Sequence, residues 1–371
     1  MKNRNRVSLF NILSTCLQYG ISLFTAPLFS RLLGTDGYGA VANYTVWVSV
    51  LSVSATLLTY GTLAPAMVEY PEEDQKKYQS SVMTLSLCTF FTVTVLIALF
   101  LGPISRGLRL SPFFIFLILF QSIGTFGINF MNTKLTYEMQ AGKNLILSVG
   151  TSLTTLVLSL VLVLLLPQGL KHYGRILGIA GVYGVLGLIM CLSVLRGGRT
   201  FYAPGYWKFC VPLAIPLVFY NLADLLLGHS DVIMLRQLLS QSTSGIYNYG
   251  YQLGTILFTL FNALNNSWVA FFYADFKQGK TQDVRRQSRN FLELFTVLSA
   301  GFLLLCREVY MLYARQDFWA ATNLVPLFAA SHYLTFLGTF PANYEYYHKK
   351  MKMGAAATIV SCLVNIGLNL V

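Results

Sequence analysis

Long apolar stretches alternate with short polar segments along the whole chain. Many reach the roughly 20 residues that a helix needs to cross the hydrocarbon core of a bilayer. An outer-membrane β-barrel would instead alternate apolar and polar residues over about ten positions, and the sequence lacks this alternation. The pattern therefore predicts a polytopic helical bundle with about eleven spans. These lie at residues 8–30, 40–63, 80–101, 112–132, 144–166, 176–195, 208–235, 245–271, 290–310, 319–342 and 353–371.

The start of the chain, MKNRNRVSLF, is basic and then apolar, as in a signal peptide. Its apolar stretch continues to Phe29 without a small-residue cleavage site, so we expect a retained first span. The predicted loops are short, the longest running from about Ala274 to Arg289. They leave no room for a soluble catalytic domain, and we expect a protein that is not an enzyme.

Composition supports the membrane interpretation. Hydrophobic residues make up 55% of the 371 positions and charged residues only 11%, whereas soluble domains carry roughly 25% charged residues. The six cysteines lie in or beside apolar segments without a CxxC pair, and the four histidines have no metal-ligand spacing. We therefore expect packing cysteines, no bound metal and no catalytic residue.

The net charge of +12 could suggest a nucleic-acid partner, but the basic residues lie in short loops between the predicted spans. With the N-terminus placed in the cytoplasm, the cytoplasmic segments carry 18 of the 26 lysines and arginines. This asymmetry follows the positive-inside rule. It predicts a multi-pass protein with a cytoplasmic N-terminus and no nucleic-acid partner.

The two halves of the chain show a weak internal repeat. A shift of 206 residues superposes Leu32, Leu33 and Gly39 on Leu238, Leu239 and Gly245. The order of elements also recurs, because a span, a short loop ending in glycine, a second span and an acidic residue follow one another in both halves. This order predicts two pseudo-symmetric six-helix bundles, at residues 1–200 and 201–371. The chain ends inside its eleventh predicted span, so we expect the second bundle to be incomplete.

Three segments carry a family resemblance. They are FSRLLGTDGYGAVANYTVWVSVLS (29–52), ADLLLGHSDVIMLRQLLSQSTSGIYNYGYQLG (223–254) and AFFYADF (270–276). They resemble the polysaccharide biosynthesis proteins, which are oligosaccharide flippases of the multidrug/oligosaccharidyl-lipid/polysaccharide exporter superfamily. Members have twelve to fourteen spans, so this chain lacks at least one.

The resemblance implies two helical bundles around a central cavity in a bacterial plasma membrane. It also implies transport of a polyprenyl-diphosphate-linked oligosaccharide, for capsule, exopolysaccharide or O-antigen. Membrane lipid and the lipid-linked oligosaccharide would be the partners, and other polysaccharide-assembly membrane proteins are candidate partners. No cofactor is expected, although a proton or a sodium ion could drive transport.

Polar residues form a stripe on each of two predicted spans. Asn11 and Gln18 lie on the first, together with Ser14, Ser22 and Thr25; Asn221, Asp224 and Asp231 lie on the seventh. The 206-residue shift places Gln18 on Asp224, which favours a shared cavity over hydrogen bonding between helices. A carboxylate near mid-membrane is costly, so Asp224 is a candidate proton or sodium site, with a structural ion pair as the alternative. A helix-terminal pair with Arg236 would be enough to explain Asp231.

Several cations are candidate ligands of the diphosphate. Arg31 follows the first predicted span, and guanidinium groups bind phosphate in a bidentate manner; it could equally anchor the helix end. Arg6, Lys134 and Arg289 are alternative ligands at the cytoplasmic mouth. Each of them can also be explained as a basic residue that only sets the membrane topology. Arg289 lies four residues before Glu293, a spacing typical of a local ion pair on a helix. Tyr247, with Tyr249 and Tyr251, could stack on sugars or form an interfacial aromatic belt.

Other functions remain alternatives to the flippase. A drug or metabolite antiporter of the same superfamily is the nearest, and a peptidoglycan-precursor flippase also fits the sequence. A membrane-embedded polysaccharide polymerase or glycosyltransferase would need a large outer loop or an acidic-motif domain, and the sequence has neither.

Overall fold

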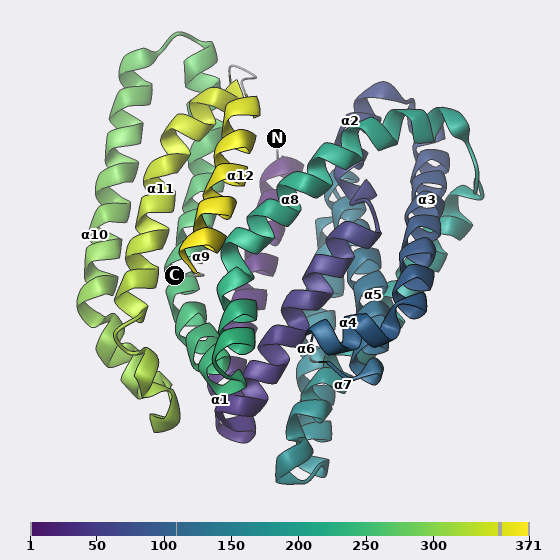
Figure 1. Ribbon diagram of the computed structural model, residues 1–371. Coiled ribbons are helices and arrows are strands. Elements are labelled where there is room, and N and C mark those ends of the chain that lie inside the picture. Colours follow the sequence, from purple (N-terminus) through teal and green to yellow (C-terminus); the bar gives the residue numbers. More distant parts are fainter. Residues whose placement is uncertain (1, 109, 348–350, 370–371) are drawn as a thin grey trace. The chain divides into compact units, whose positions relative to one another are not determined.

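The computed structural model describes residues 2–108, 110–347 and 351–369, and the part of the chain that it describes contains helices and no strand (Figure 1). The α-helices are α1 (Lys2–Ala55), α2 (Leu63–Glu69), α3 (Glu72–Leu99), α4 (Leu101–Leu108), α5 (Pro112–Tyr137), α6 (Ala141–Leu165), α7 (Lys171–Gly198), α8 (Pro204–Leu238), α9 (Gln241–Lys277), α10 (Thr281–Tyr313), α11 (Val325–Tyr347) and α12 (Met351–Leu368). Three 3-10 turns are η1 (Thr59–Thr62), η2 (Gln168–Leu170) and η3 (Gln316–Ala321). The predicted all-α fold is confirmed.

The first two predicted spans lie on one helical stretch, α1, which bends at a single residue. Gly34 has φ 67° and ψ −176°, a conformation that glycine adopts without a Cβ penalty. The helix ends at Ala55 rather than at residue 63, because Leu57 and Leu58 have positive φ angles. The short elements η1 and α2 complete the second predicted span, bent by 52° from α1.

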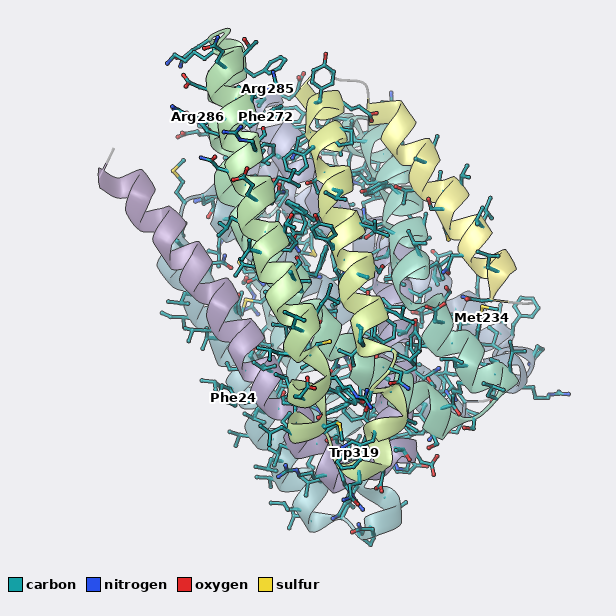
Figure 2. The ribbon with its side chains drawn as sticks, turned by 90° about the vertical axis from the view of Figure 1, so that its left-hand side faces the viewer. Phe24, Met234, Phe272, Arg285, Arg286 and Trp319 are labelled. Atoms are coloured by element: carbon teal, nitrogen blue, oxygen red, sulfur yellow. The ribbon has the colours of Figure 1, made fainter. Side chains whose placement is uncertain are left out.

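Six described helices are long and apolar enough to cross a membrane, namely α3, α5, α6, α7 with η2, α8 and α10. The bent pair formed by Gly20–Ala55 and Thr59–Glu69 would be a seventh. Large apolar side chains such as Phe24, 78% exposed on α1 (Figure 2), and Leu304, 79% exposed on α10, lie on the surface. Such a surface suits lipid rather than water. The protein is therefore a polytopic helical membrane protein, and the count of eleven spans stays a prediction.

The helices group into two compact units. Unit 1 comprises Met1–Thr25 and Ala40–Ser230, and unit 2 comprises Ala26–Gly39 and Asp231–Val371. The short segment Ala26–Gly39 at the bend of α1 thus packs with the second half of the chain. The predicted boundary between residues 200 and 201 stays a prediction.

In unit 1, α5 and α7 pack with their backbones in contact. A Cβ on Gly187 would lie 2.0 Å from the carbonyl oxygen of Gly124, and one on Gly124 would lie 2.2 Å from the oxygen of Tyr183. Small residues allow such close packing in membranes, where the hydrophobic effect gives little drive for helix association. Around this crossing, buried aromatic residues such as Phe126 and Phe130 fill the core of the unit.

In unit 2, aromatic rings form the core between α9, α10 and α11. Phe295 and Phe336 are fully buried, with ring centroids 4.4 Å apart, and Phe261 packs against both. A second cluster includes Tyr38 from the bend of α1, with Tyr249 of α9. The bend of α1 is therefore part of the core of unit 2.

Candidate functional site

Two of the candidate transport residues, Asn221 and Asp224, lie near the middle of α8 within unit 1. The Asn221 amide donates a hydrogen bond of 2.8 Å to the carbonyl of Leu217, one turn earlier on the same helix. Asp224 is exposed, and the described part of the chain shows no hydrogen bond or salt bridge at its carboxylate, although the nearby His229 interacts with it electrostatically. A carboxylate in lipid is costly, and the assignment of Asp224 as a proton or sodium site stays a prediction.

Asp231 lies about two helical turns after Asp224 on α8 and has different surroundings, in unit 2. Tyr247 of α9 donates its hydroxyl to one carboxylate oxygen, and Asn369, after α12, donates its amide to the other. The Tyr247 ring packs edge-on against Phe328, with centroids 5.1 Å apart. The Asp231 carboxylate thus joins three segments of unit 2. Neither hydrogen bond was predicted, because the donors lie on other segments, 16 and 138 residues away in the sequence.

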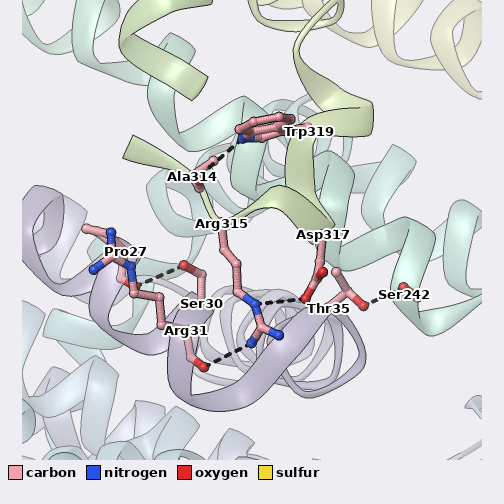
Figure 3. Close-up of polar contacts among 9 residues, drawn as sticks. All are labelled: Pro27, Ser30, Arg31, Thr35, Ser242, Ala314, Arg315, Asp317 and Trp319. Atoms are coloured by element: carbon pink, nitrogen blue, oxygen red, sulfur yellow. Dashed lines mark hydrogen bonds and ion pairs between the residues drawn. The ribbon is translucent and has the colours of Figure 1, made fainter. Parts of the chain in front are cut away.

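Arg31 lies at the bend of α1, beside a polar cluster (Figure 3). Its carbonyl oxygen accepts a hydrogen bond of 3.4 Å from the guanidinium of Arg315. Arg315 also forms an ion pair of 3.0 Å with Asp317. The Arg31 side chain is exposed. The backbone of Arg31 is thus fixed to the α10–α11 connection, while its predicted contact with phosphate stays a prediction.

The bend of α1 meets the start of α9 in a reciprocal contact. A Cβ on Gly39 would lie 2.0 Å from the carbonyl oxygen of Gln241, and a Cβ on Gly245 would lie 2.3 Å from that of Thr35. The 206-residue shift relates Gly39 to Gly245 and Thr35 to Gln241. Under this shift, the contact of Gly39 with Gln241 corresponds to the contact of Gly245 with Thr35. Such a reciprocal pair of contacts is typical of an interface around a two-fold axis. The contact lies within unit 2, and the division into two pseudo-symmetric six-helix bundles stays a prediction.

Side-chain hydrogen bonds reinforce the same contact. Gln241 donates to the carbonyl of Asp36 at 2.8 Å, and Ser242 donates to the Thr35 hydroxyl at 2.7 Å. Deeper in the unit, the hydroxyl of Tyr38 donates to the Gln252 side chain at 2.6 Å, and its ring packs on Tyr249. Tyr38 and Gln252 were not predicted as positioning residues, although Tyr38 lies in the first family-like segment.

Arg289 forms the predicted local pair on α10. Its guanidinium lies 3.6 Å from the carboxylate of Glu293, and the two side chains are 70% and 66% exposed. The same end of α10 carries Arg285 and Arg286 (Figure 2). An exposed helix pair contributes less than about 1 kcal/mol. The local helix pair is therefore confirmed, and a contact of Arg289 with substrate stays a prediction.

Three further candidates are on the first half of α1. The backbone of Arg6, Asn11 and Gln18 belongs to that helix, and their side chains lie outside the described residues. Further along the stripe, the Thr25 hydroxyl donates to the carbonyl of Ser22 at 3.0 Å, within the helix. The polar stripe is thus on a helix, as predicted, while its direction toward a cavity stays a prediction.

Comparison with solved structures identifies the fold. An inward-facing multidrug resistance MATE family transporter of the MOP superfamily is similar with 12% identity and a TM-score of 0.59, covering 96% of this chain and 84% of that one. An outward-facing multidrug resistance MATE family transporter is similar with 14% identity and a TM-score of 0.61, and the match covers 98% of this chain and 86% of that one. A MOP superfamily transporter from Pyrococcus furiosus is similar with 13% identity and a TM-score of 0.55, and the match covers 97% of this chain and 94% of that one. The polarity of its binding pocket is described as reversed and as suggesting a different function. At these identities the likeness concerns the fold alone.

Comparison with protein families is more specific. No curated protein sequence matches the chain. The family described as "Polysaccharide biosynthesis protein" matches residues 6–271, which is more than half of the chain and includes both family-like segments around the two reciprocal glycines. The chain therefore belongs to the polysaccharide biosynthesis protein family, with the fold of the MOP superfamily transporters.

Proposed function

We propose that this protein is a flippase for polyprenyl-diphosphate-linked oligosaccharide in a bacterial plasma membrane, acting in the synthesis of capsule, exopolysaccharide or O-antigen. The observation that carries the proposal is the family match over residues 6–271. The transporter fold agrees with it, since transport, rather than catalysis, suits a chain built of spans joined by short connections.

The chemistry of the substrate sets what the protein must supply. Sugars and phosphates lose several kcal/mol for each polar group that enters hydrocarbon without a partner. A path across the membrane therefore needs hydrated, polar surface on otherwise apolar helices. The exposed Asp224 and its neighbour Asn221 on α8 supply polar surface of this kind.

The two aspartates of α8 take different roles in this proposal. Asp231 accepts hydrogen bonds on both carboxylate oxygens from Tyr247 and Asn369, so it holds helices together. Asp224 is exposed and is the candidate for binding a driving proton or sodium ion. Arg31, also exposed, is the candidate ligand of the diphosphate.

A drug or metabolite antiporter is the second candidate function. The likeness in fold to multidrug resistance MATE family transporters favours it. The two functions differ in the chemistry of the cargo, because a drug antiporter has no need of a diphosphate ligand such as Arg31.

The test expresses the protein in a bacterial strain that lacks its polysaccharide flippase and is hypersensitive to drugs. Surface polysaccharide and drug resistance are measured in the same cells, with membrane abundance determined by immunoblot. Restored polysaccharide without added drug resistance is the expected result. Drug resistance without polysaccharide, at normal abundance, would favour the antiporter instead.

A further inference from the structure

A cavity of about 550 Å³ opens where the ends of α3, α5, α6 and α7 meet within unit 1. Its polar lining comes from Lys76 near the start of α3, Lys134 and Glu138 at the end of α5, Gln140 just before α6, and Lys143 at the start of α6. None of the candidate transport residues on α1 or α8 lines it. The cavity is therefore separate from the transport candidates on α1 and α8, and it includes Lys134, an alternative candidate ligand of the diphosphate.

The charge of the cavity favours an anion. Three lysines and one glutamate give a net charge of +2, from three positive charges and one negative charge. The glutamate is already engaged, because Glu138 lies 3.9 Å from the Lys134 ammonium and accepts a hydrogen bond of 2.9 Å from Gln140. Within the described part of the chain, no ion pair engages Lys76 or Lys143, and both are exposed. Two ammonium groups therefore remain for a ligand.

The rest of the lining is apolar and continues from the lysines along the helices. Ile146 and Leu147 lie about one helical turn beyond Lys143 on α6. Met131 lies about one turn before Lys134 on α5, and Met190 of α7 completes this wall. Ile146 is 73% exposed although it belongs to a membrane-spanning helix. The wall therefore offers an apolar track that starts at the charged end of the cavity.

We propose that this cavity binds an anionic phospholipid, with the headgroup phosphate at Lys76 and Lys143 and an acyl chain along Ile146 and Leu147. Ammonium groups at the ends of spans attract phosphate headgroups, and a basic pocket between spanning helices fits such a lipid. A soluble anion would use the lysines and leave the apolar wall uncovered. The proposal rests on the membrane location of the chain and is independent of the flippase activity.

The test measures lipid binding to the full-length protein in detergent by native mass spectrometry. Phosphatidylglycerol and phosphatidylcholine with the same acyl chains are compared, and the anionic lipid is expected to bind more tightly. The double variant Lys76→Gln/Lys143→Gln should weaken phosphatidylglycerol binding on the order of tenfold or more, because each lysine near the surface contributes to headgroup attraction. Lys76→Arg/Lys143→Arg keeps both charges and should bind like the parent protein.

The matched control is Lys171→Gln/Lys208→Gln, which removes two lysines that do not line the cavity, and it should bind like the parent. Equal binding of the two lipids, or equal loss in the control or the arginine variant, would overturn the proposal. Inorganic diphosphate that displaces phosphatidylglycerol at equal concentration would mean a free-anion site and would also overturn it. So would lysine-dependent binding of a polyprenyl diphosphate by a protein that does not bind phosphatidylglycerol.

Discussion

Two aspartates on one helix, Asp224 and Asp231, differ in what surrounds them. The exposed Asp224 accepts no hydrogen bond within the described part of the chain and interacts only electrostatically with His229, whereas Asp231 accepts hydrogen bonds from Tyr247 and Asn369. A residue that binds a mobile ion must release it, and an open carboxylate can do so. A carboxylate bound by two donors from other segments stabilises the structure. The two residues are therefore expected to respond differently to substitution.

The variant Asp224→Asn is expected to lose transport at nearly normal membrane abundance. Asparagine keeps the size and most of the hydrogen-bonding capacity but removes the charge that would bind a proton or sodium ion. Polysaccharide export is measured across pH, with protein abundance in the same membranes. Asp283→Asn, which removes an exposed carboxylate on α10 outside the candidate transport residues, serves as the matched control. Export at the parental rate across pH would make Asp224 a structural residue.

The variant Tyr247→Phe is expected to lower thermal stability in detergent. It removes the hydroxyl donor to Asp231, and loss of one buried hydrogen bond costs about 1–3 kcal/mol when the acceptor is left unsatisfied. The midpoint of thermal unfolding is compared with that of Tyr202→Phe, whose side chain is 68% exposed. Equal midpoints for the two variants would show that the Asp231 contact contributes nothing to stability.

At the scale of elements, each predicted span has a helix in the structure, because runs of apolar residues fix where helices lie in a membrane. The predicted end of the second span was wrong, because the positive φ angles of Leu57 and Leu58 end α1 and the apolar pattern does not reveal such angles. They also missed the partners of Asp231, because Asn369 is 138 residues away and only packing brings them together. The internal shift paired Gly39 with Gly245 without revealing that the two regions touch.

The crossing of α1 and α9 is expected to tolerate no side chain at its glycines. In the variant Gly39→Ala, the added Cβ would lie 2.0 Å from the carbonyl oxygen of Gln241, so the backbones must separate. Overpacking of this kind costs about 1–3 kcal/mol. Gly245→Ala should behave alike, since the contact is reciprocal.

The matched control for this crossing is Gly301→Ala on α10, where a Cβ would meet no atom within 4 Å. Alanine at an open helical position is expected to gain about 0.5–1 kcal/mol relative to glycine. Thermal unfolding in detergent should therefore place Gly39→Ala below the parent and Gly301→Ala at or above it. The same midpoint for both variants would contradict the close contact of the backbones.

Contacts within each unit agree with the charge asymmetry of the sequence. In unit 1, Gly198 at the end of α7 packs against the backbone of Lys76 on α3, and both belong to segments predicted to be cytoplasmic. In unit 2, Arg315 binds the backbone of Arg31, and both belong to the side predicted to be external. Residues assigned to the same side by the positive-inside rule thus meet at the same helix ends.

The charge asymmetry therefore predicts the orientation of the spans, with the N-terminus in the cytoplasm. In a background without cysteines, single cysteines are placed in exposed connections of intact cells. Gly197→Cys and Gln278→Cys are expected to resist a membrane-impermeant thiol reagent until the cells are opened, because the lysines and arginines around them hold their connections in the cytoplasm. Gly169→Cys and Gln316→Cys should react in intact cells. Because Gln278 and Gln316 flank the same helix, α10, their labelling must differ if that helix spans the membrane. Reaction of Gln278→Cys but not of Gln316→Cys in intact cells would invert the orientation, and reaction of both would remove α10 from the spans.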